Sequence, residues 1–143
     1  MKRTLLVAAA VLALLVPASA FAAWTSGRYA GRTNQAKAIA FYASQTRASS
    51  LRLYARFRCT DGEVFTALLS GFPSQRIGPD GRYNATYTGT SGASRYVHRG
   101  RVVNRRAIGT FTGRRVYNEL NRLDRTGDIV CVTGVIGYSI PRV

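Results

Sequence analysis

The stretch LRLYARFRC, residues 51–59, alternates between two kinds of side chain without interruption. Successive side chains of a β-strand point to opposite faces, so this period of two predicts a half-buried strand. The core-facing set is Leu51, Leu53, Ala55, Phe57 and Cys59, and the solvent-facing set is Arg52, Tyr54, Arg56 and Arg58. A strand of this kind needs partners with the same period, and the flanking sequence supplies them.

The flanking sequence predicts an all-β domain of about eight antiparallel strands. TDG at 60–62 is a tight-turn signal that makes a hairpin of the strands on either side, and Asn104-Arg105 is expected to turn another. Alternating runs broken by Gly, Asp-Gly or Pro give the expected strands, which are 27–33, 37–44, 51–59, 63–70, 83–89, 95–103, 106–117 and 128–140. Residues 117–125 read as a loop or a single helical turn. The pattern indicates one antiparallel β-sandwich or flattened barrel and does not choose between the two.

The N-terminus has the pattern of a secretory signal peptide. Lys2 and Arg3 precede an apolar run and then small residues, which fits cleavage after Ala20 or Ala22. We therefore expect a signal peptide at 1–22 and a single β domain at 23–143. No second apolar run reaches the roughly 20 residues that a membrane-spanning helix needs, so we expect a secreted or otherwise extracytoplasmic protein without a membrane span in the mature chain.

The two cysteines of the chain, Cys59 and Cys131, both fall in the mature part. An even number of cysteines in an exported chain favours a disulfide. The alternative, a pair of metal ligands, lacks both the close CxxC spacing and companion histidines. The sequence therefore predicts one disulfide.

Five short motifs resemble a pattern found in uncharacterised small secreted bacterial β-domain proteins. They are GRYAGRT (27–33), CTDG (59–62), GRYNATY (81–87), AIGTFTG (107–113) and CVTG (131–134). The resemblance covers nearly the whole mature chain and implies a single β domain with its two cysteines bonded and no assigned activity. The chain departs from the pattern by its many arginines and by a longer polar insert at 117–128. The recurring Gly-aromatic motif is interpreted as a strand start, since Gly suits a turn and the aromatic residue suits the core.

Few residues suit catalysis or metal binding. The chain has one histidine, His98, and no Gly-x-Ser-x-Gly motif. Its carboxylates carry no paired signature of a glycosidase or a metal loop; they are Asp61, Glu63, Asp80, Glu119, Asp124 and Asp128. We expect no enzymatic activity, no cofactor and no metal. The alternative is a small exported hydrolase that uses a carboxylate or His98.

The charge of the chain suggests what it binds. Removing Lys2 and Arg3 lowers the formal net charge from +15 to +13, and Lys37 is the one lysine left. An Arg–Tyr sheet surface would suit phosphate or carboxylate groups and stacking, if the strands that carry these residues are neighbours. The candidate anion-binding residues are Arg52, Tyr54, Arg56, Arg58, Arg95, Arg99, Arg101, Arg105, Arg106, Arg114 and Arg115.

Export argues against cytoplasmic nucleic acid as the partner of these arginines and favours anionic envelope or extracellular polymers. The function predicted from the sequence is that of a secreted, disulfide-stabilised, non-enzymatic binding or envelope-associated protein. A solvated basic face without any partner is the other interpretation of the same pattern.

Overall fold

The computed structural model describes residues 24–89 and 91–143, so the predicted signal peptide, 1–22, lies outside the described residues. The described residues form ten strands in one antiparallel sheet and no helix, which confirms the predicted all-β class. The strands are β1 (Gly27–Arg32), β2 (Ala38–Ala43), β3 (Arg47–Cys59), β4 (Val64–Leu69), β5 (Gln75–Arg76), β6 (Arg82–Thr88), β7 (Ser94–Val103), β8 (Arg106–Tyr117), β9 (Ile129–Val132) and β10 (Ile136–Pro141). No helix in the described ranges is long and apolar enough to cross a membrane.

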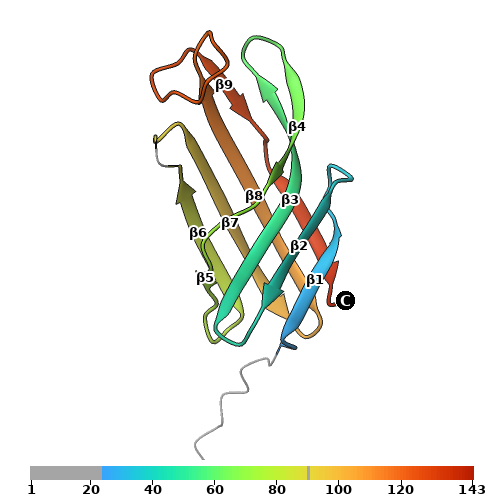
Figure 1. Cartoon of the computed structure of the whole chain (residues 1–143). Helices are drawn as coiled ribbons and strands as arrows, with labels where there is room; N and C mark the ends of the chain where they lie inside the picture. Colours follow the sequence, from blue (N-terminus) through green and yellow to red (C-terminus); the bar gives the residue numbers. More distant parts are fainter. Residues whose placement is uncertain (1–23, 90) are drawn as a thin grey trace, which may run out of the picture.

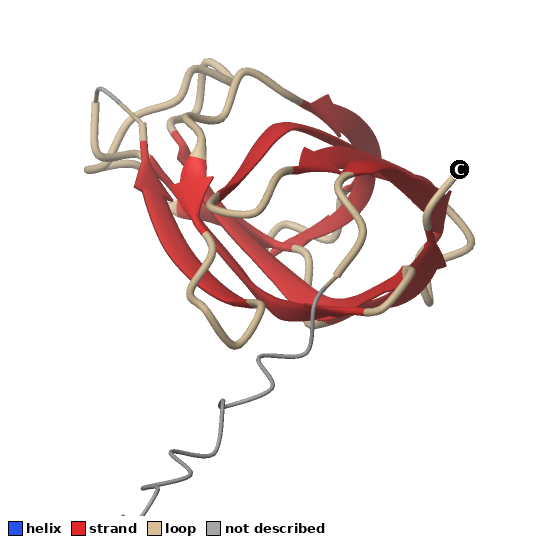
Figure 2. Cartoon of the chain, turned by 90° about the horizontal axis from the view of Figure 1, so that it is seen from below, coloured by secondary structure: helices blue, strands red, loops and turns tan. Residues whose placement is uncertain are grey.

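The sheet closes on itself. Its order is β1-β2-β3-β9-β8-β7-β6, with β4 and β5 paired to β3 and β10 paired to β8. Two isolated bridges connect β1 with β10: Tyr29 of β1 pairs with Arg142, just after β10, and Thr33, just after β1, pairs with Tyr138 of β10. A third bridge, from Ile77 to Tyr83, connects the end of β5 with β6. The strands therefore surround one core, as Figures 1 and 2 show, and the arrangement is the flattened barrel of the two that the sequence allowed.

The core forms from the inward side chains of this one sheet. In β3 the predicted alternation is confirmed over 51–58: Leu53, Ala55 and Phe57 are buried, and Tyr54 and Arg56 between them are exposed. Phe41 of β2 and Phe111 of β8 are also fully buried, from strands on different sides of the barrel. The period of two therefore assigns the residues of 51–58 to their correct faces; β3 itself begins earlier, at Arg47, and its alternation breaks at Ser50, which has a φ of 56°.

The predicted single closing strand at 128–140 is wrong, because the chain makes two strands there. β8 is longer than either of its partners, so β9 pairs with its end at 114–117 and β10 pairs with its beginning at 106–111. Between them the Thr133 hydroxyl accepts a hydrogen bond from the Gly113 backbone N–H at 2.8 Å, and Gly134 turns the chain with a φ of 67°. A two-residue strand, β5, also forms in the expected loop after β4. These two changes raise the strand number from about eight to ten.

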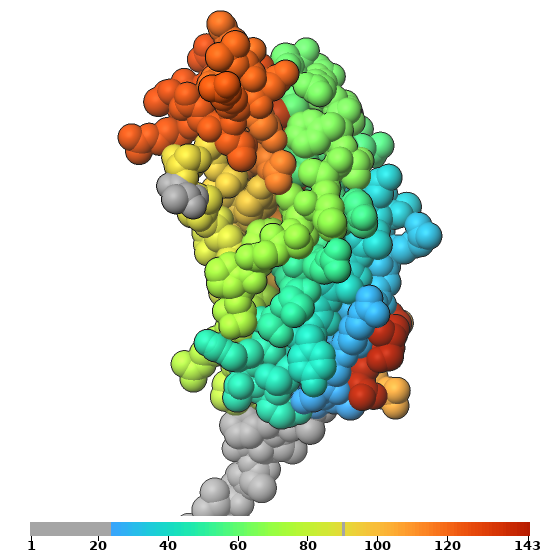
Figure 3. All heavy atoms as spheres, viewed as in Figure 1, coloured from blue at the N-terminus to red at the C-terminus, as the bar shows by residue number. Residues whose placement is uncertain are grey.

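The predicted disulfide is confirmed. Cys59 and Cys131 stand directly opposite each other in the short pairing of β3 with β9, and their Cα atoms are 3.9 Å apart. Only one other residue pair, Arg58 with Val132, belongs to this pairing. The disulfide therefore joins β3 to β9 at the end of the molecule where the loop 118–128 and the turn before β4 gather (Figures 1 and 3).

Candidate anion-binding site

The outer face of the β7–β8 hairpin carries most of the predicted anion-binding residues. Residues 94–117 contain seven arginines and no acidic residue. Six of these arginines are exposed, and we call them the basic strip: Arg95, Arg99, Arg101, Arg105, Arg106 and Arg114. They lie together because the tight turn at Asn104, which has a φ of 53°, pairs the two strands along their whole length.

Cross-strand pairing brings like charges together in the strip. Arg95 of β7 stands directly opposite Arg114 of β8, and Arg101 of β7 stands opposite Arg82 of β6. Like charges directly opposite each other in an antiparallel pair are destabilising. The ion pair between Arg82 and Asp80, at 3.4 Å, is the one that occurs among the described residues, so the strip itself is not neutralised by acids of the chain.

Several guanidinium groups of the strip are oriented by hydrogen bonds to neutral partners. The Arg99 Nε donates to the Asn84 side chain at 3.1 Å, and the Arg101 Nε donates to the Asp80 carbonyl at 2.9 Å. Arg106 donates to the Ser139 carbonyl and hydroxyl, both at 2.9 Å. Each group keeps further N–H donors beyond these bonds, so the strip presents oriented donors on a rigid sheet.

The strand β3 meets this strip at one level. The condition that the arginine-bearing strands be neighbours is met by β7 and β8, but β9 and β8 separate β3 from β7. At the end that carries the disulfide, pairing places Arg58, Val132, Arg114 and Arg95 in one outward row across β3, β9, β8 and β7. Arg58 is therefore the residue of β3 that extends the strip.

The other candidates on β3 lie on a different face. Arg52 and Tyr54 line a shallow hollow of about 230 Å³ together with Arg28 of β1. The backbone N–H of Arg56 donates to the Gln35 side chain at 2.9 Å. These three residues belong with β1 and β2 rather than with the strip.

Arg115 points into the barrel and is only partly exposed, so it does not belong to the basic strip. Its Nε donates to the Tyr96 hydroxyl at 2.7 Å, its Nη1 donates to the Tyr117 hydroxyl at 3.2 Å, and its guanidinium carbon lies 5.0 Å from the centre of the Phe57 ring. The sequence could have predicted this inward position, because Arg115 lies four residues after the buried Phe111 in the same strand and therefore on the same face of it. The predicted set therefore divides into an outer strip, a separate hollow and one inward arginine.

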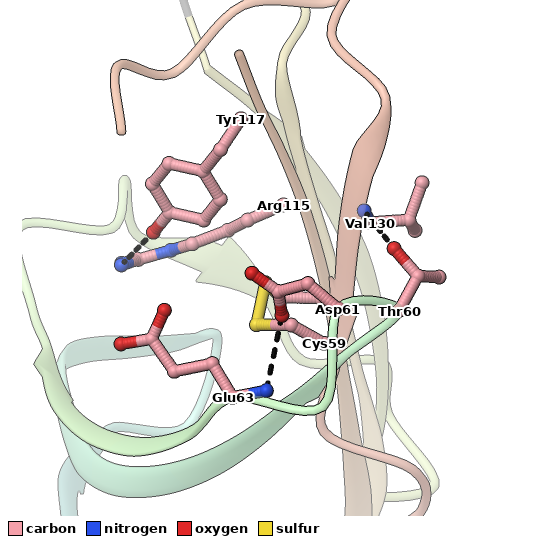
Figure 4. The surroundings of a disulfide bond; sticks show 8 residues. Cys59, Thr60, Asp61, Glu63, Arg115, Tyr117 and Val130 are labelled. Atoms are coloured by element: carbon pink, nitrogen blue, oxygen red, sulfur yellow. Dashed lines mark hydrogen bonds between the residues drawn. A yellow bond between two sulfur atoms is a disulfide. The ribbon is translucent and has the colours of Figure 1, made fainter. Parts of the chain in front are cut away.

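The surroundings of the disulfide bring Arg115 and Glu63 to one end of the barrel. Arg115 is opposite Cys131 in the β8–β9 pairing, and the backbone carbonyl of Glu63 accepts a hydrogen bond from the Cys59 N–H at 2.9 Å. Figure 4 draws their side chains on the same side of the disulfide. A hollow of about 240 Å³ opens there, lined in part by Phe65, Tyr117, Glu63 and both cysteines.

His98 lies in a buried chain of polar side chains. Its Nδ1 is 2.6 Å from the Gln75 Nε2, its Nε2 is 2.5 Å from the Tyr138 hydroxyl, and that hydroxyl is 2.5 Å from the hydroxyl of Tyr83. The Gln75 amide donates to Nδ1, so the ring carries its proton on Nε2 and donates to Tyr138. Sequence alternation put His98 on the face of Tyr96, but its two hydrogen-bond partners come from β5 and β10, and Tyr83, which bonds to Tyr138, comes from β6, so no local signal could reveal them.

This buried network keeps His98 away from solvent and gives it neutral hydrogen-bond partners. Burial lowers the pKa of His98 to about 3, and its side chain is fully buried. Two of the carboxylates hold turns: Asp61 accepts a hydrogen bond from the Glu63 N–H at 3.0 Å, and Asp80 accepts one from the Arg82 N–H at 3.1 Å. The geometry therefore gives His98 a structural position.

Comparisons with known proteins add no assignment. No protein-family model matches the sequence, and no curated protein and no solved structure matches it either. The resemblance to small secreted β-domain proteins thus stays a prediction. Within 24–89 and 91–143 no three or more His, Cys, Asp or Glu side chains form a group that could hold a metal ion.

Proposed function

We propose that the protein is an exported, non-enzymatic binding protein whose basic strip holds a linear anionic polymer of the cell envelope or the extracellular medium. The observation that carries the proposal is the β7–β8 hairpin itself, which presents six outward arginines and no acid. The predicted signal peptide supports export, and a disulfide fits an oxidising compartment.

The spacing of the strip suits an extended polymer. At a rise of about 3.3 Å per residue, Arg95 and Arg99 are about 13 Å apart along β7, and Arg99 and Arg101 are about 7 Å apart. Arg106 continues the line on β8, beside Val103 of β7, so the strip runs for about 26 Å along the hairpin. Each guanidinium can donate a pair of hydrogen bonds to a phosphate or carboxylate group, which favours ligands with repeated anionic groups.

The test compares binding of the mature chain, from residue 23, to a poly(glycerol phosphate), to DNA and to neutral dextran over a range of salt concentrations. We expect retention on the two polyanions that weakens steeply with salt and no retention on dextran. Equal retention on dextran and on the polyanions would discard the proposal.

A matched pair of variants separates the strip from net charge. The strip variant replaces Arg95, Arg99 and Arg101 by Gln; the control variant replaces Arg28, Arg32 and Arg56, which are exposed on other strands, and changes the net charge equally. We expect the strip variant to lose at least about tenfold in affinity for the polyanions, at 1.4 kcal/mol per tenfold change, and the control variant to lose much less. Equal losses would mean that binding follows overall charge and not the strip.

A further inference from the structure

An apolar hollow lies at the end of the strip that is nearest the disulfide. It has a volume of about 390 Å³, and its lining includes Arg95, Arg114, Val97, Val132 and Val135. Val132 is 44% exposed and Val135 is 65% exposed. We call Val97, Val132 and Val135 the valine patch. An apolar surface beside a pair of arginines distinguishes this end of the strip from the rest.

The two arginines at this hollow are the like-charged pair that stands directly opposite across β7 and β8. Arg58 approaches the same level from β3, with Val132 between it and Arg114. No ion pair within the described residues neutralises any of these three arginines. Such an arrangement costs the isolated protein free energy, and an anion between Arg95 and Arg114 would turn the repulsion into two attractions.

The valines are held outward by the same register that places the arginines. Val132 pairs with both Arg58 and Arg114, so its side chain shares their outer face. Val97 stands opposite Thr112, one outward row further along β7 and β8 from the arginine pair. Val135 follows Gly134, whose positive φ turns the chain out between β9 and β10. Two of the three valines therefore belong to the sheet surface next to the charged pair, and Val135 lies in the connection between β9 and β10.

We propose that this end of the strip binds a single anionic amphiphile, a phosphate ester that carries an alkyl chain, with its phosphate between Arg95 and Arg114 and its chain on the valine patch. The inference rests on the proposed function, since it uses two arginines of the strip, and it adds the chemical class of the group held there. Charge complementarity selects the anionic head, and burial of the exposed valines selects the hydrocarbon.

The test titrates the mature chain with decyl phosphate below its micellar concentration, with inorganic phosphate and with decyl maltoside, and follows binding by calorimetry. Decyl phosphate is expected to bind at least about tenfold more tightly than either of the other two, because only it uses both halves of the site and burying a few methylenes is sufficient for that selectivity. Equal affinity for decyl phosphate and inorganic phosphate, or for decyl phosphate and decyl maltoside, would overturn the proposal.

Variants locate the two halves. Replacing Val132 and Val135 by Ser is expected to reduce the affinity for decyl phosphate to that for inorganic phosphate and to leave polyanion binding unchanged. Replacing Ile108 by Ser, an exposed aliphatic residue opposite Arg101 and outside the hollow, is the matched control and is expected to change neither. Unchanged binding of decyl phosphate in the Val132 and Val135 variant would refute the placement of the chain.

The outcomes separate this inference from the polymer proposal. Polyanion retention together with equal binding of decyl phosphate and inorganic phosphate would uphold the strip and overturn the amphiphile site. Selective binding of decyl phosphate without polyanion retention would overturn the polymer proposal and uphold the site. If the substitutions Val132→Ser and Val135→Ser left binding to vesicles of anionic lipid unchanged, this binding would reflect general attraction of the basic protein to an anionic surface and would count against the site.

Discussion

Mild acid is expected to destabilise this protein through one side chain, His98. It is the only histidine in the chain, it is fully buried, and burial lowers its pKa to about 3. The groups around it are neutral: Gln75, and the phenols of Tyr83 and Tyr138, whose pKa values burial raises. No charged partner is in contact to stabilise an imidazolium, so the folded state keeps the ring neutral.

The sign and size follow from linkage. Between pH 6.5, the ordinary pKa of histidine, and pH 3 the unfolded chain binds a proton that the folded chain does not. The free energy of unfolding therefore falls as the pH drops below 6.5. The contribution of His98 to this fall ends near pH 3, where the folded state also binds the proton. At pH 5 the loss relative to pH 8 is about 2 kcal/mol, a large fraction of the stability of a typical domain.

The assay is urea unfolding at pH 8 and pH 5, followed by the fluorescence of Trp24, the only tryptophan, which is buried and donates to the Ser44 carbonyl at 3.0 Å. We expect the midpoint to fall by about 1 M urea. The variant His98→Phe is expected to be less stable than the wild type at pH 8. Its urea midpoint should change much less between pH 8 and pH 5 than that of the wild type. In the wild-type protein the His98 ring should not titrate by NMR between pH 8 and 5. A ring that titrates near 6.5, or a midpoint that does not move, would refute the reasoning.

Three further predictions concern stability and use the same unfolding assay. Replacing Cys59 by Ser should cost up to about 4 kcal/mol under oxidising conditions, because it removes a crosslink over a long loop; an unchanged midpoint would contradict this. Replacing Gly100 by Ala should cost about 1–3 kcal/mol, since a Cβ there would lie 2.5 Å from the Tyr83 hydroxyl, whereas Gly137→Ala, with its nearest neighbour 3.8 Å away, should cost clearly less. Replacing Tyr138 by Phe should cost about 1–3 kcal/mol, because it leaves buried polar partners unpaired; a neutral effect would mean that the buried chain adds nothing to stability.

The sequence by itself determined the local features of this protein. The alternation of 51–59 placed the residues of that part of β3 on their faces, because the period of two belongs to the strand backbone. The tight turns after Cys59 and at Asn104 followed from local turn chemistry, and the disulfide followed from an even number of cysteines. The inward position of Arg115 also followed from the alternation of β8, because Arg115 is an even number of residues from Phe111. The neighbouring arginines nevertheless suggested one common surface.

Only the tertiary structure decided what lies beside what. The barrel required bridges between β1 and β10, and the division of the closing segment into β9 and β10 arose because both pair with one longer strand, β8. The partners of His98 come from segments 23 to 40 residues away. Arg58 joins the strip only because β9 sets its register to both β3 and β8. Strand order and register depend on packing between distant segments, and no local period of the sequence encodes them.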